Sequence, residues 1–327
     1  MKTVFVTGVN GLLGTNLTQL LLEQGFSVKA LVRDRQKYKG AQNPDLQLIE
    51  GDLFDDLTKI MSGVDYVIHT AAITSQNLPD ILEYQSVNCN ATIQLFHTAL
   101  KCKVKRFIFV STVNTLGGGS SDNPGSEDTI AGEPFNSLFY VQSKKAAEDY
   151  LLSFRTEMDT IIVNPAFMLG AFDTKPSSGK IILMGMGKRV IFYPPGGKNF
   201  VHVEDVANGI INALEKGKCG EKYILGNENL TFKEFFIKLN KVAYQKPLMI
   251  MVPKVVLIIL GLIGDLLRIL KIKTVLSSIN MKILCLKNYY SNTKSASELG
   301  VNYQPVEKAI EDAINYFNKN KNGQYLK

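Results

Sequence analysis

Tyr140 and Lys144 have the residue types and the spacing that suit proton transfer to an oxygen atom. They lie four positions apart in a segment that predicts a helix over Phe135–Phe154, so their side chains share one face. A free tyrosine loses its proton near pH ~10, and a nearby lysine ammonium favours the phenolate and lowers that pKa. The same ammonium could bind the ribose hydroxyls of a nicotinamide cofactor, and the hydroxyl of Ser111 or Thr112 could hold the substrate oxygen.

A second pair, Tyr290 and Lys294, has the same spacing, so spacing alone does not identify a site. No predicted strand that ends in a hydroxyl residue precedes this second pair in the sheet. Tyr140, by contrast, follows the predicted strand Lys105–Val110 and the Ser111-Thr112 step by one loop. Order along the chain therefore selects the first pair, and the competing interpretation is an incidental pair on a helix surface.

These groups need a cofactor site beside them, and the start of the chain predicts one. Val4–Val6 reads as a buried parallel strand, and Leu12–Leu22 has helical periodicity. Between them Gly8 allows a tight turn, Gly11 lets phosphates approach the backbone, and Gly14 lets the helix pack close to the strand. The free N–H groups and the dipole of the helix N-terminus could then bind a pyrophosphate. The spacing is one residue longer than G-x-G-x-x-G, and a structural turn without a ligand is the alternative.

The end of the second predicted strand, Val28–Val32, bears on the kind of dinucleotide. An acidic residue at this place binds the ribose 2′-hydroxyl, whereas an arginine accommodates a 2′-phosphate. Arg33 therefore predicts NADP rather than NAD, with Arg35 or Lys37 as helpers. Asp34 keeps NAD open, and ordinary solvated charges are the alternative interpretation.

Two further strand ends could contact the cofactor. Asp52 follows the predicted strand Leu46–Glu50, and its carboxylate could accept a hydrogen bond from the adenine amino group. Small residues at Thr70–Ala72 follow the predicted strand Asp65–His69, where they would let the backbone lie against the cofactor.

Strands and helices alternate with short connections, which predicts an α/β fold with a Rossmann-type doubly wound parallel sheet and right-handed crossovers. The remaining predicted elements are a helix over Pro79–Cys102, a flexible loop over Gly117–Pro134, a strand over Thr160–Val163, a helix over Val203–Leu214 and a strand over Lys222–Leu225.

After Asn164 the alternation weakens and turn-rich stretches appear, which is typical of a smaller domain of loops and short helices. We therefore expect a dinucleotide-binding domain at residues 1–165 and 200–226. A smaller, mostly helical substrate-binding domain would take residues 166–199 and 227–327.

Composition limits the function classes. The chain has 327 residues, 45% of them hydrophobic, and a formal net charge of +7. The Lys and Arg residues do not cluster as they do in nucleic-acid-binding proteins, so we expect a small-molecule substrate and no nucleic acid. Four scattered cysteines and a first strand that starts at residue 2 predict a reduced, cytoplasmic protein without a signal peptide. Three dispersed histidines predict no metal site.

The set of motifs resembles the extended short-chain dehydrogenase/reductase family over nearly the whole chain. The matching stretches are TGVNGLLG (Thr7–Gly14), GDL (Gly51–Leu53), HTAA (His69–Ala72), VST (Val110–Thr112), YVQSK (Tyr140–Lys144) and FVHVEDVANG (Phe200–Gly209). By this resemblance Tyr140 is the general acid/base, Lys144 its partner and ribose ligand, and Thr112 the donor to the substrate oxygen. Asn88 resembles the helical asparagine of the family. The expected cofactor-binding residues are Gly8, Asn10, Gly11, Leu12, Leu13, Gly14, Arg33, Lys37, Asp52, Leu53, Thr70, Ala71, Ala72, Asn88, Tyr140 and Lys144.

Within the family, Val163–Ile182 and Gly220–Thr231 resemble dihydroflavonol-4-reductase-like proteins, with the 3β-hydroxysteroid dehydrogenases as near relatives. Sugar-nucleotide epimerases usually carry Arg-Pro where this chain has Asn164-Pro165. The resemblance thus implies an NADP-dependent reductase of a ketone, steroid-like or otherwise lipophilic. The alternatives are a nucleotide-sugar epimerase or dehydratase with tightly bound NAD, and a non-catalytic cofactor-binding regulatory protein.

Pro247–Leu270 is unusually apolar, but its longest uncharged run, Val255–Gly264, is too short to span a bilayer. Three interpretations compete: the core of the small domain, the lining or lid of an apolar substrate pocket, and peripheral contact with a membrane surface. The family resemblance also implies a homodimer through helices 79–102 and 135–154.

Overall fold

A computed structural model describes residues 1–75, 78, 80–270, 272, 274 and 276–320. Its largest sheet has seven strands, all parallel, in the order β10-β6-β5-β4-β1-β2-β3. The strands are β1 (Thr3–Thr7), β2 (Ser27–Val32), β3 (Leu46–Glu50), β4 (Tyr66–His69), β5 (Arg106–Val110), β6 (Asp159–Pro165) and β10 (Lys222–Leu225). The strand order reverses between β1 and β4, which opens a crevice at the carboxyl ends of these strands. The predicted doubly wound sheet is confirmed.

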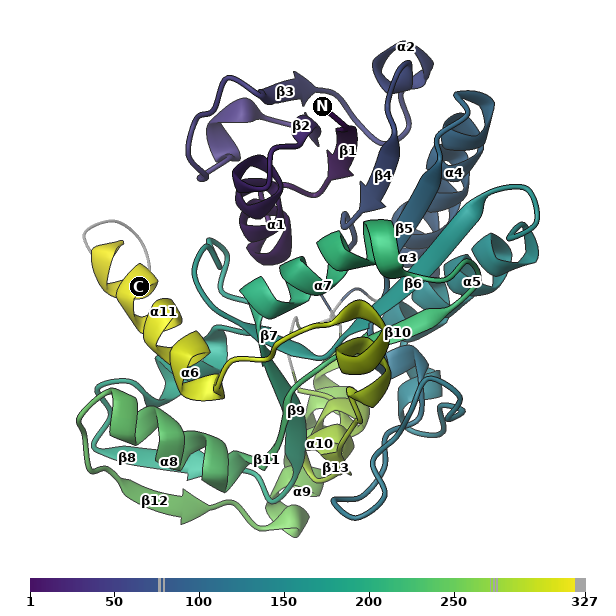
Figure 1. The fold of residues 1–327 in the computed structure, drawn as a ribbon. Helices are drawn as coiled ribbons and strands as arrows, with labels where there is room; N and C mark the ends of the chain where they lie inside the picture. The colour runs from purple at the N-terminus through teal and green to yellow at the C-terminus, as the bar shows by residue number, and fades with distance from the viewer. Residues whose placement is uncertain (76–77, 79, 271, 273, 275, 321–327) are drawn as a thin grey trace.

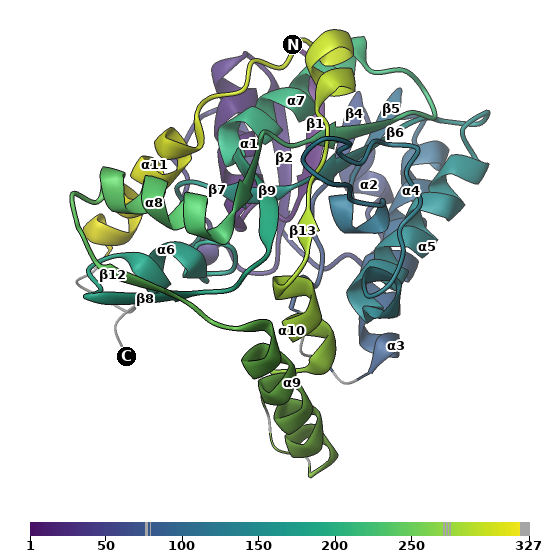
Figure 2. The ribbon, with the colours of Figure 1, turned by 90° about the horizontal axis from the view of Figure 1, so that it is seen from below.

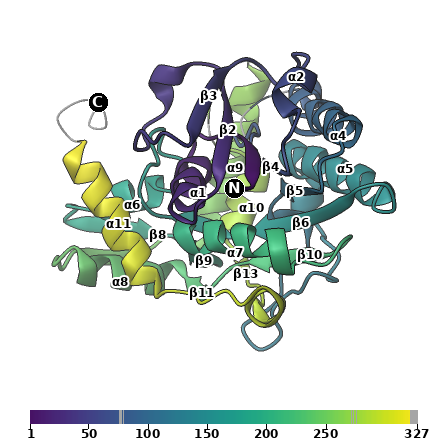
Figure 3. The same cartoon turned by 45° about the horizontal axis from the view of Figure 1, so that its top comes forward.

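Helices cover both faces of this sheet (Figures 1 and 3). α1 (Leu12–Glu23) and α7 (Val203–Lys216) pack side by side on one face. α2 (Thr58–Met61), α4 (Ala91–Lys101) and α5 (Phe139–Ser153) cover the other. Because successive side chains of a strand point to opposite faces, Val4 and Val6 join the first layer and Phe5 joins the second.

Two predicted helices are divided. The segment predicted as one helix over Pro79–Cys102 forms α3 (Ile81–Tyr84), a π-helical turn at Gln85–Asn90 and then α4, while Pro79 itself lies outside the described residues. The segment Phe135–Phe154 begins with a 3₁₀ turn at Phe135–Ser137, and α5 starts only after the extended residue Leu138. Tyr140 therefore lies in the first turn of α5.

The smaller region contains more β-structure than its turn-rich sequence predicts. β9 (Gly197–His202) pairs with β7 (Phe167–Leu169), β11 (Glu228–Thr231) and β13 (Lys287–Asn288), and β8 (Val190–Tyr193) pairs with β12 (Leu248–Met251). Its helices are α6 (Lys180–Gly185), α8 (Phe232–Val242), α9 (Lys254–Ile269), α10 (Ser278–Leu284) and α11 (Val306–Lys319). β9 belongs to this smaller sheet although it overlaps the range 200–226; the domain boundaries stay a prediction.

The loop predicted as flexible, Gly117–Pro134, is anchored to the C-terminal part of the chain. The N–H groups of Gly119 and Gly125 both donate to the carbonyl oxygen of Tyr289, at 2.9 and 3.0 Å. Tyr290 is buried beside it and accepts a hydrogen bond from the Asn288 amide at 2.6 Å, which gives this tyrosine a structural environment.

Candidate active site

The glycine turn after β1 has the geometry of a phosphate cradle. Gly8 has a φ of +75°, and a Cβ there would lie 2.5 Å from Thr70 Oγ1. A Cβ on Gly14 would lie 2.1 Å from the Gly8 carbonyl oxygen, so only glycine lets α1 approach β1 this closely. Gly11 is the N-cap residue of α1 and, without a side chain, leaves the first N–H groups of the helix uncapped. A Cβ at Gly11 would meet no atom nearer than 3.4 Å. The first N–H groups of α1 are thus available to an anion.

A cleft of about 2090 Å³ runs from this turn to Tyr140 and Lys144. The predicted cofactor residues that line it are Gly8, Asn10, Gly11, Leu12, Leu13, Gly14, Arg33, Lys37, Asp52, Leu53, Thr70, Ala71, Ala72, Tyr140 and Lys144. One continuous cleft therefore brings the two halves of the predicted site together. Their individual roles stay predictions.

Just after the carboxyl end of β2, three basic side chains line the cleft, whereas Asp34 does not. Arg33 and Lys37 line it together with Lys39. Asp34 instead accepts a hydrogen bond from Gln36 N at 2.9 Å and pairs with Lys37 at 3.0 Å. The lysine beside Asp34 lowers the pKa of that carboxyl group. The carboxylate is engaged within its own turn rather than directed at the cleft.

Tyr140 forms a hydrogen bond with Thr112, and its acidity differs from the expectation. Burial raises the pKa of Tyr140 to about 12, and the hydrogen bond with Thr112 only partly offsets this. The expectation that Lys144 lowers the pKa of Tyr140 is wrong for this arrangement. Thr112 is buried and does not line the cleft, so it reaches the site through Tyr140.

Lys144 is held away from the tyrosine by other partners. Its Nζ donates to the Val110 carbonyl oxygen at 2.6 Å and lies 3.8 Å from the centre of the Phe109 ring. Burial lowers the pKa of Lys144 to about 7, and the charge of Glu148 acts in the opposite direction. In this arrangement the lysine is therefore close to titrating at neutral pH.

Glu148 is a buried residue of this site that we did not predict. Its side chain accepts hydrogen bonds from Ser111, from Thr115 at 2.6 Å and from Asn164 at 3.0 Å, and it pairs with Lys222 at 2.6 Å. The spacing Tyr140-x₃-Lys144-x₃-Glu148 places all three on one face of α5, and this extended spacing could have revealed it.

The asparagine of the Asn164-Pro165 step belongs to the same network. Asn164 Nδ2 donates to the Thr112 carbonyl oxygen at 3.0 Å and to Thr115 Oγ1 at 3.1 Å, as well as to Glu148. Asn164 is fully buried and so braces the strand end that carries Thr112.

Asn88 lies beneath the cleft and does not line it. Its side-chain oxygen accepts from Ile73 N at 2.7 Å, and its amide group donates to Ile73 O and to Ser143 Oγ, each at 3.1 Å. These bonds fix the loop after β4 against α5. A direct contact with the cofactor stays a prediction, and the geometry favours an indirect role.

Part of the cleft lining is apolar and contains a cation without a carboxylate partner among the described residues. Phe167, Met168 and Phe172 line it with Lys198. Lys198 Nζ lies 4.7 Å from the centre of the Phe167 ring, and burial lowers the pKa of this lysine to about 8. In the part of the chain that the structure describes, no carboxylate pairs with Lys198.

One group of side chains has the spacing of metal ligands. His202, Glu204 and Asp312 offer ligand atoms within 4.8 Å of one another. His202 Nε2 lies 3.0 Å from Asp312 Oδ2, and its Nδ1 accepts the Glu204 N–H at 3.0 Å. Both ring nitrogens already have partners, and the histidine serves as the N-cap of α7.

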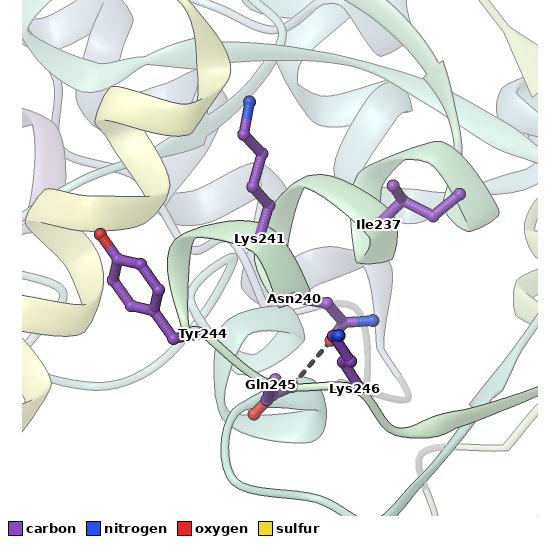
Figure 4. Close-up of a pocket in the computed structure, with 6 residues that line it drawn as sticks. All are labelled: Ile237, Asn240, Lys241, Tyr244, Gln245 and Lys246. Carbon is purple, nitrogen blue, oxygen red and sulfur yellow. Dashed lines mark hydrogen bonds between the residues drawn. The ribbon is translucent and has the colours of Figure 1, made fainter.

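A smaller hollow of about 420 Å³ lies at the end of α8 (Figure 4). Its lining residues are Ile237, Asn240, Lys241, Tyr244, Gln245 and Lys246. A hydrogen bond of 2.8 Å joins Gln245 to Asn240 across it. It shares no residue with the large cleft, so it takes no part in the candidate site.

Comparison with known proteins decides the family. The model of the NAD dependent epimerase/dehydratase family matches residues 4–226. The chain belongs to this family. The resemblance to extended short-chain dehydrogenases/reductases is thereby confirmed, and the protein is an NAD(P)-dependent oxidoreductase.

Individual known proteins are similar to most of the chain. A Synechocystis protein named "Putative dihydroflavonol 4-reductase" is 30% identical over 99% of this chain and 96% of its own length. A Dictyostelium discoideum protein named "Sterol-4-alpha-carboxylate 3-dehydrogenase, decarboxylating" is 30% identical over 72% of this chain and 75% of its own length. The crystal structure of gox2253 superposes with a TM-score of 0.84, at 31% identity, over 99% of this chain and 100% of that one.

Proposed function

We propose that this protein reduces a lipophilic ketone to an alcohol with NADPH. The observation that supports it most is the single cleft in which the glycine turn, Tyr140 and Lys144 meet. The bound nicotinamide supplies the hydride that adds to the carbonyl carbon. The chain supplies the proton for the carbonyl oxygen and the surfaces that hold both reactants in place.

Tyr140 suits the role of proton donor in this direction. With a pKa of about 12 its hydroxyl keeps its proton at neutral pH. As negative charge develops on the substrate oxygen, the O–H bond breaks, the proton passes to that oxygen, and the phenolate remains beside Thr112. Lys144, protonated on approach to the phenolate, would then stabilise its charge.

NADPH is favoured over NADH by the charges at the end of β2. Arg33, Lys37 and Lys39 line the cleft there, and Asp34 is engaged by Lys37 and by its own turn. Cations suit a 2′-phosphate, whereas a ribose 2′-hydroxyl needs a free carboxylate.

We infer further that the ketone carries an anionic group. Phe167, Met168 and Phe172 would contact an apolar body, and Lys198 has no carboxylate partner among the described residues. A substrate carboxylate would stabilise this half-buried ammonium. The name of the Dictyostelium relative includes a sterol 4-carboxylate, which agrees with this substrate class.

The test is NADPH oxidation with a panel of cyclic ketones, with and without a carboxylate. Tyr140→Phe removes the proton donor, so we expect turnover to fall by at least about a hundredfold while NADPH still binds. Tyr290→Phe is the matched control, since it alters the other tyrosine of the same spacing, and its turnover should stay close to wild type.

Other outcomes would support the alternatives. NAD(H) that co-purifies tightly, without consumption of added NADPH, would favour an epimerase or dehydratase. A protein that binds NADPH but neither reduces nor oxidises any member of the panel would favour a regulatory role. Unchanged turnover in Tyr140→Phe would exclude the proposed proton donor.

We also infer a homodimer through the α3–α4 segment and α5, which the family resemblance implies. A small aromatic cluster joins the outer sides of these helices: His97 Nε2 lies 2.7 Å from the Tyr150 hydroxyl, and Phe154 packs against both rings. Ala146 is exposed at the centre of α5 and would permit close approach of a second copy.

A further inference from the structure

Helix α9 exposes a continuous aliphatic surface. Its exposed apolar side chains are Val255, Val256, Ile258, Ile259, Leu262, Ile263, Leu266 and Ile269. Their exposed fractions range from 37% at Ile258 to 77% at Ile269. Single exposed apolar residues are ordinary, but a contiguous group of this size marks a surface that binds something. We call these eight residues the α9 face.

The opposite side of α9 is fully used by the fold. A Cβ on Gly261 would lie 2.8 Å from Ser278 Cα, and a Cβ on Gly264 would lie 2.5 Å from the Leu276 side chain. Asp265 accepts a hydrogen bond from Ser278 N at 3.2 Å. α9 therefore packs tightly on α10, and the pair projects from the body of the protein (Figure 2).

The geometry of the α9 face is that of a helix lying in a lipid surface. At 100° per residue, the eight positions cover an arc of about 160° that contains no polar residue. Sixteen residues make the helix about 24 Å long. Within the described residues, no helix is long and apolar enough to cross a membrane. The face would therefore enter the interfacial region with its axis parallel to the bilayer.

Charge and composition favour lipid over a second protein. The exposed Lys254 and Arg268 stand at the two ends of α9 and outside its apolar arc, while the only acid of the helix, Asp265, is turned to α10. This arrangement attracts anionic headgroups. The α9 face consists only of Val, Ile and Leu, whereas the centres of protein interfaces are rich in aromatic residues, Met and Arg.

The α9 face is also connected to the candidate active site. Ile279 and Ile283 of α10 pack against the cluster of Phe135, Leu138 and Val141, and Tyr140 packs against the same cluster. Asn280 of α10 lines the cleft. The helix pair thus joins an apolar outer surface to the place where the ketone would bind.

We propose that the α9 face docks this protein on anionic lipid bilayers and that its lipophilic substrate enters the cleft from the lipid. The second part rests on the proposed function. The first part does not, because docking needs neither cofactor nor ketone.

Vesicle flotation of the full chain tests the docking. We expect binding to phosphatidylcholine vesicles that contain about 30% phosphatidylglycerol, and weaker binding to phosphatidylcholine alone or in high salt. The double variant Ile259→Asp/Leu266→Asp should lower the vesicle partition coefficient by at least about tenfold, because it places two charges in the centre of the face. Ile237→Asp, at an exposed position of α8, is the matched control and should bind like wild type.

Light scattering without lipid tests the alternative occupant of the α9 face, which is a second copy of the chain. If the wild type binds neither kind of vesicle, docking on lipid is excluded. If the double variant loses a subunit contact that the wild type has, and neither protein binds vesicles, the α9 face is instead an interface between copies of the chain.

Kinetics test the second part. Both proteins should reduce a water-soluble ketone equally, and the double variant should be slower only with a ketone dissolved in vesicles. Equal rates on the vesicle-borne ketone would exclude entry from the lipid. A failure of every ketone with a vesicle-binding protein would instead overturn the proposed function and leave docking intact.

Discussion

At the scale of single residues, the protonation states at the candidate site follow from burial more than from the pairing of charges. The expected ammonium–phenol pair is not formed, because Lys144 is turned to Val110 O and the Phe109 ring. Tyr140 keeps its proton and Lys144 readily loses its own. Binding of a ribose or an oxyanion would supply the partner that keeps Lys144 charged.

Lys144 should leave a signature in the pH dependence of stability. The folded lysine releases its proton near a pKa of about 7, whereas the unfolded chain holds it up to the ordinary value of 10.5. Between these values the unfolded state binds more protons, so folding stability rises with pH there, and the contribution is lost as pH falls through 7.

Urea unfolding from pH 7 to about pH 9.5 measures this effect. The free energy of unfolding of the wild type should rise relative to that of Lys144→Met over this range. Parallel curves for the two proteins would contradict the lowered pKa. Lys198, which also titrates in this window, is common to both and cancels in the difference.

At the scale of elements, the segment after β2 presents Arg33, Lys37 and Lys39 to the cleft. Arg33→Asp replaces one of them with a carboxylate, so we expect the ratio of kcat/KM for NADPH to that for NADH to fall by at least about tenfold. Steady-state kinetics with both cofactors measure the ratio. Arg35→Asp is the control, since Arg35 does not line the cleft; an unchanged ratio in Arg33→Asp would overturn the choice of NADP.

Elements with a local signal were predictable from the sequence. β3 and β10 match their predicted bounds, and α1 starts at Leu12 as the glycine pattern requires. The π turn at Gln85–Asn90 was not predictable from the sequence, because it depends on the hydrogen bonds of Asn88 with Ile73 and Ser143, which are distant in the chain. The Glu148 network was missed for the same reason: its members come from four separate elements or loops.

The strands of the smaller region were missed on similar grounds. β7 and β13 are short, and β7, β9 and β13 pair with strands from distant parts of the chain. The role of the apolar segment Pro247–Leu270 was ambiguous, because a domain core, a pocket lining and a membrane-contacting helix can all have the same apolar composition. The positions of Gly261 and Gly264 against α10, the buried Leu257 and the bond from Ser278 to Asp265 show which side of α9 faces inward.

At the scale of the whole molecule, the proposed dimer predicts one sensitive position. Ala146→Arg places a long charged side chain on the exposed centre of α5, where it would block close approach of a second copy. Light scattering should show about twice the chain mass for the wild type and a monomer for the variant. Circular dichroism should be unchanged, and a variant that stays dimeric would move the interface elsewhere.

The anchoring of loop Gly117–Pro134 by Tyr289 has a consequence for biosynthesis. A growing polypeptide that has already produced the glycine turn, Thr112 and Tyr140 still lacks the backbone partners of Gly119 and Gly125. A chain released before residue 289 would hold every proposed reacting group but would lack the hydrogen bonds that join Gly119 and Gly125 to Tyr289. The segment that contains Tyr289, made well after Tyr140, thus completes the anchoring of this loop.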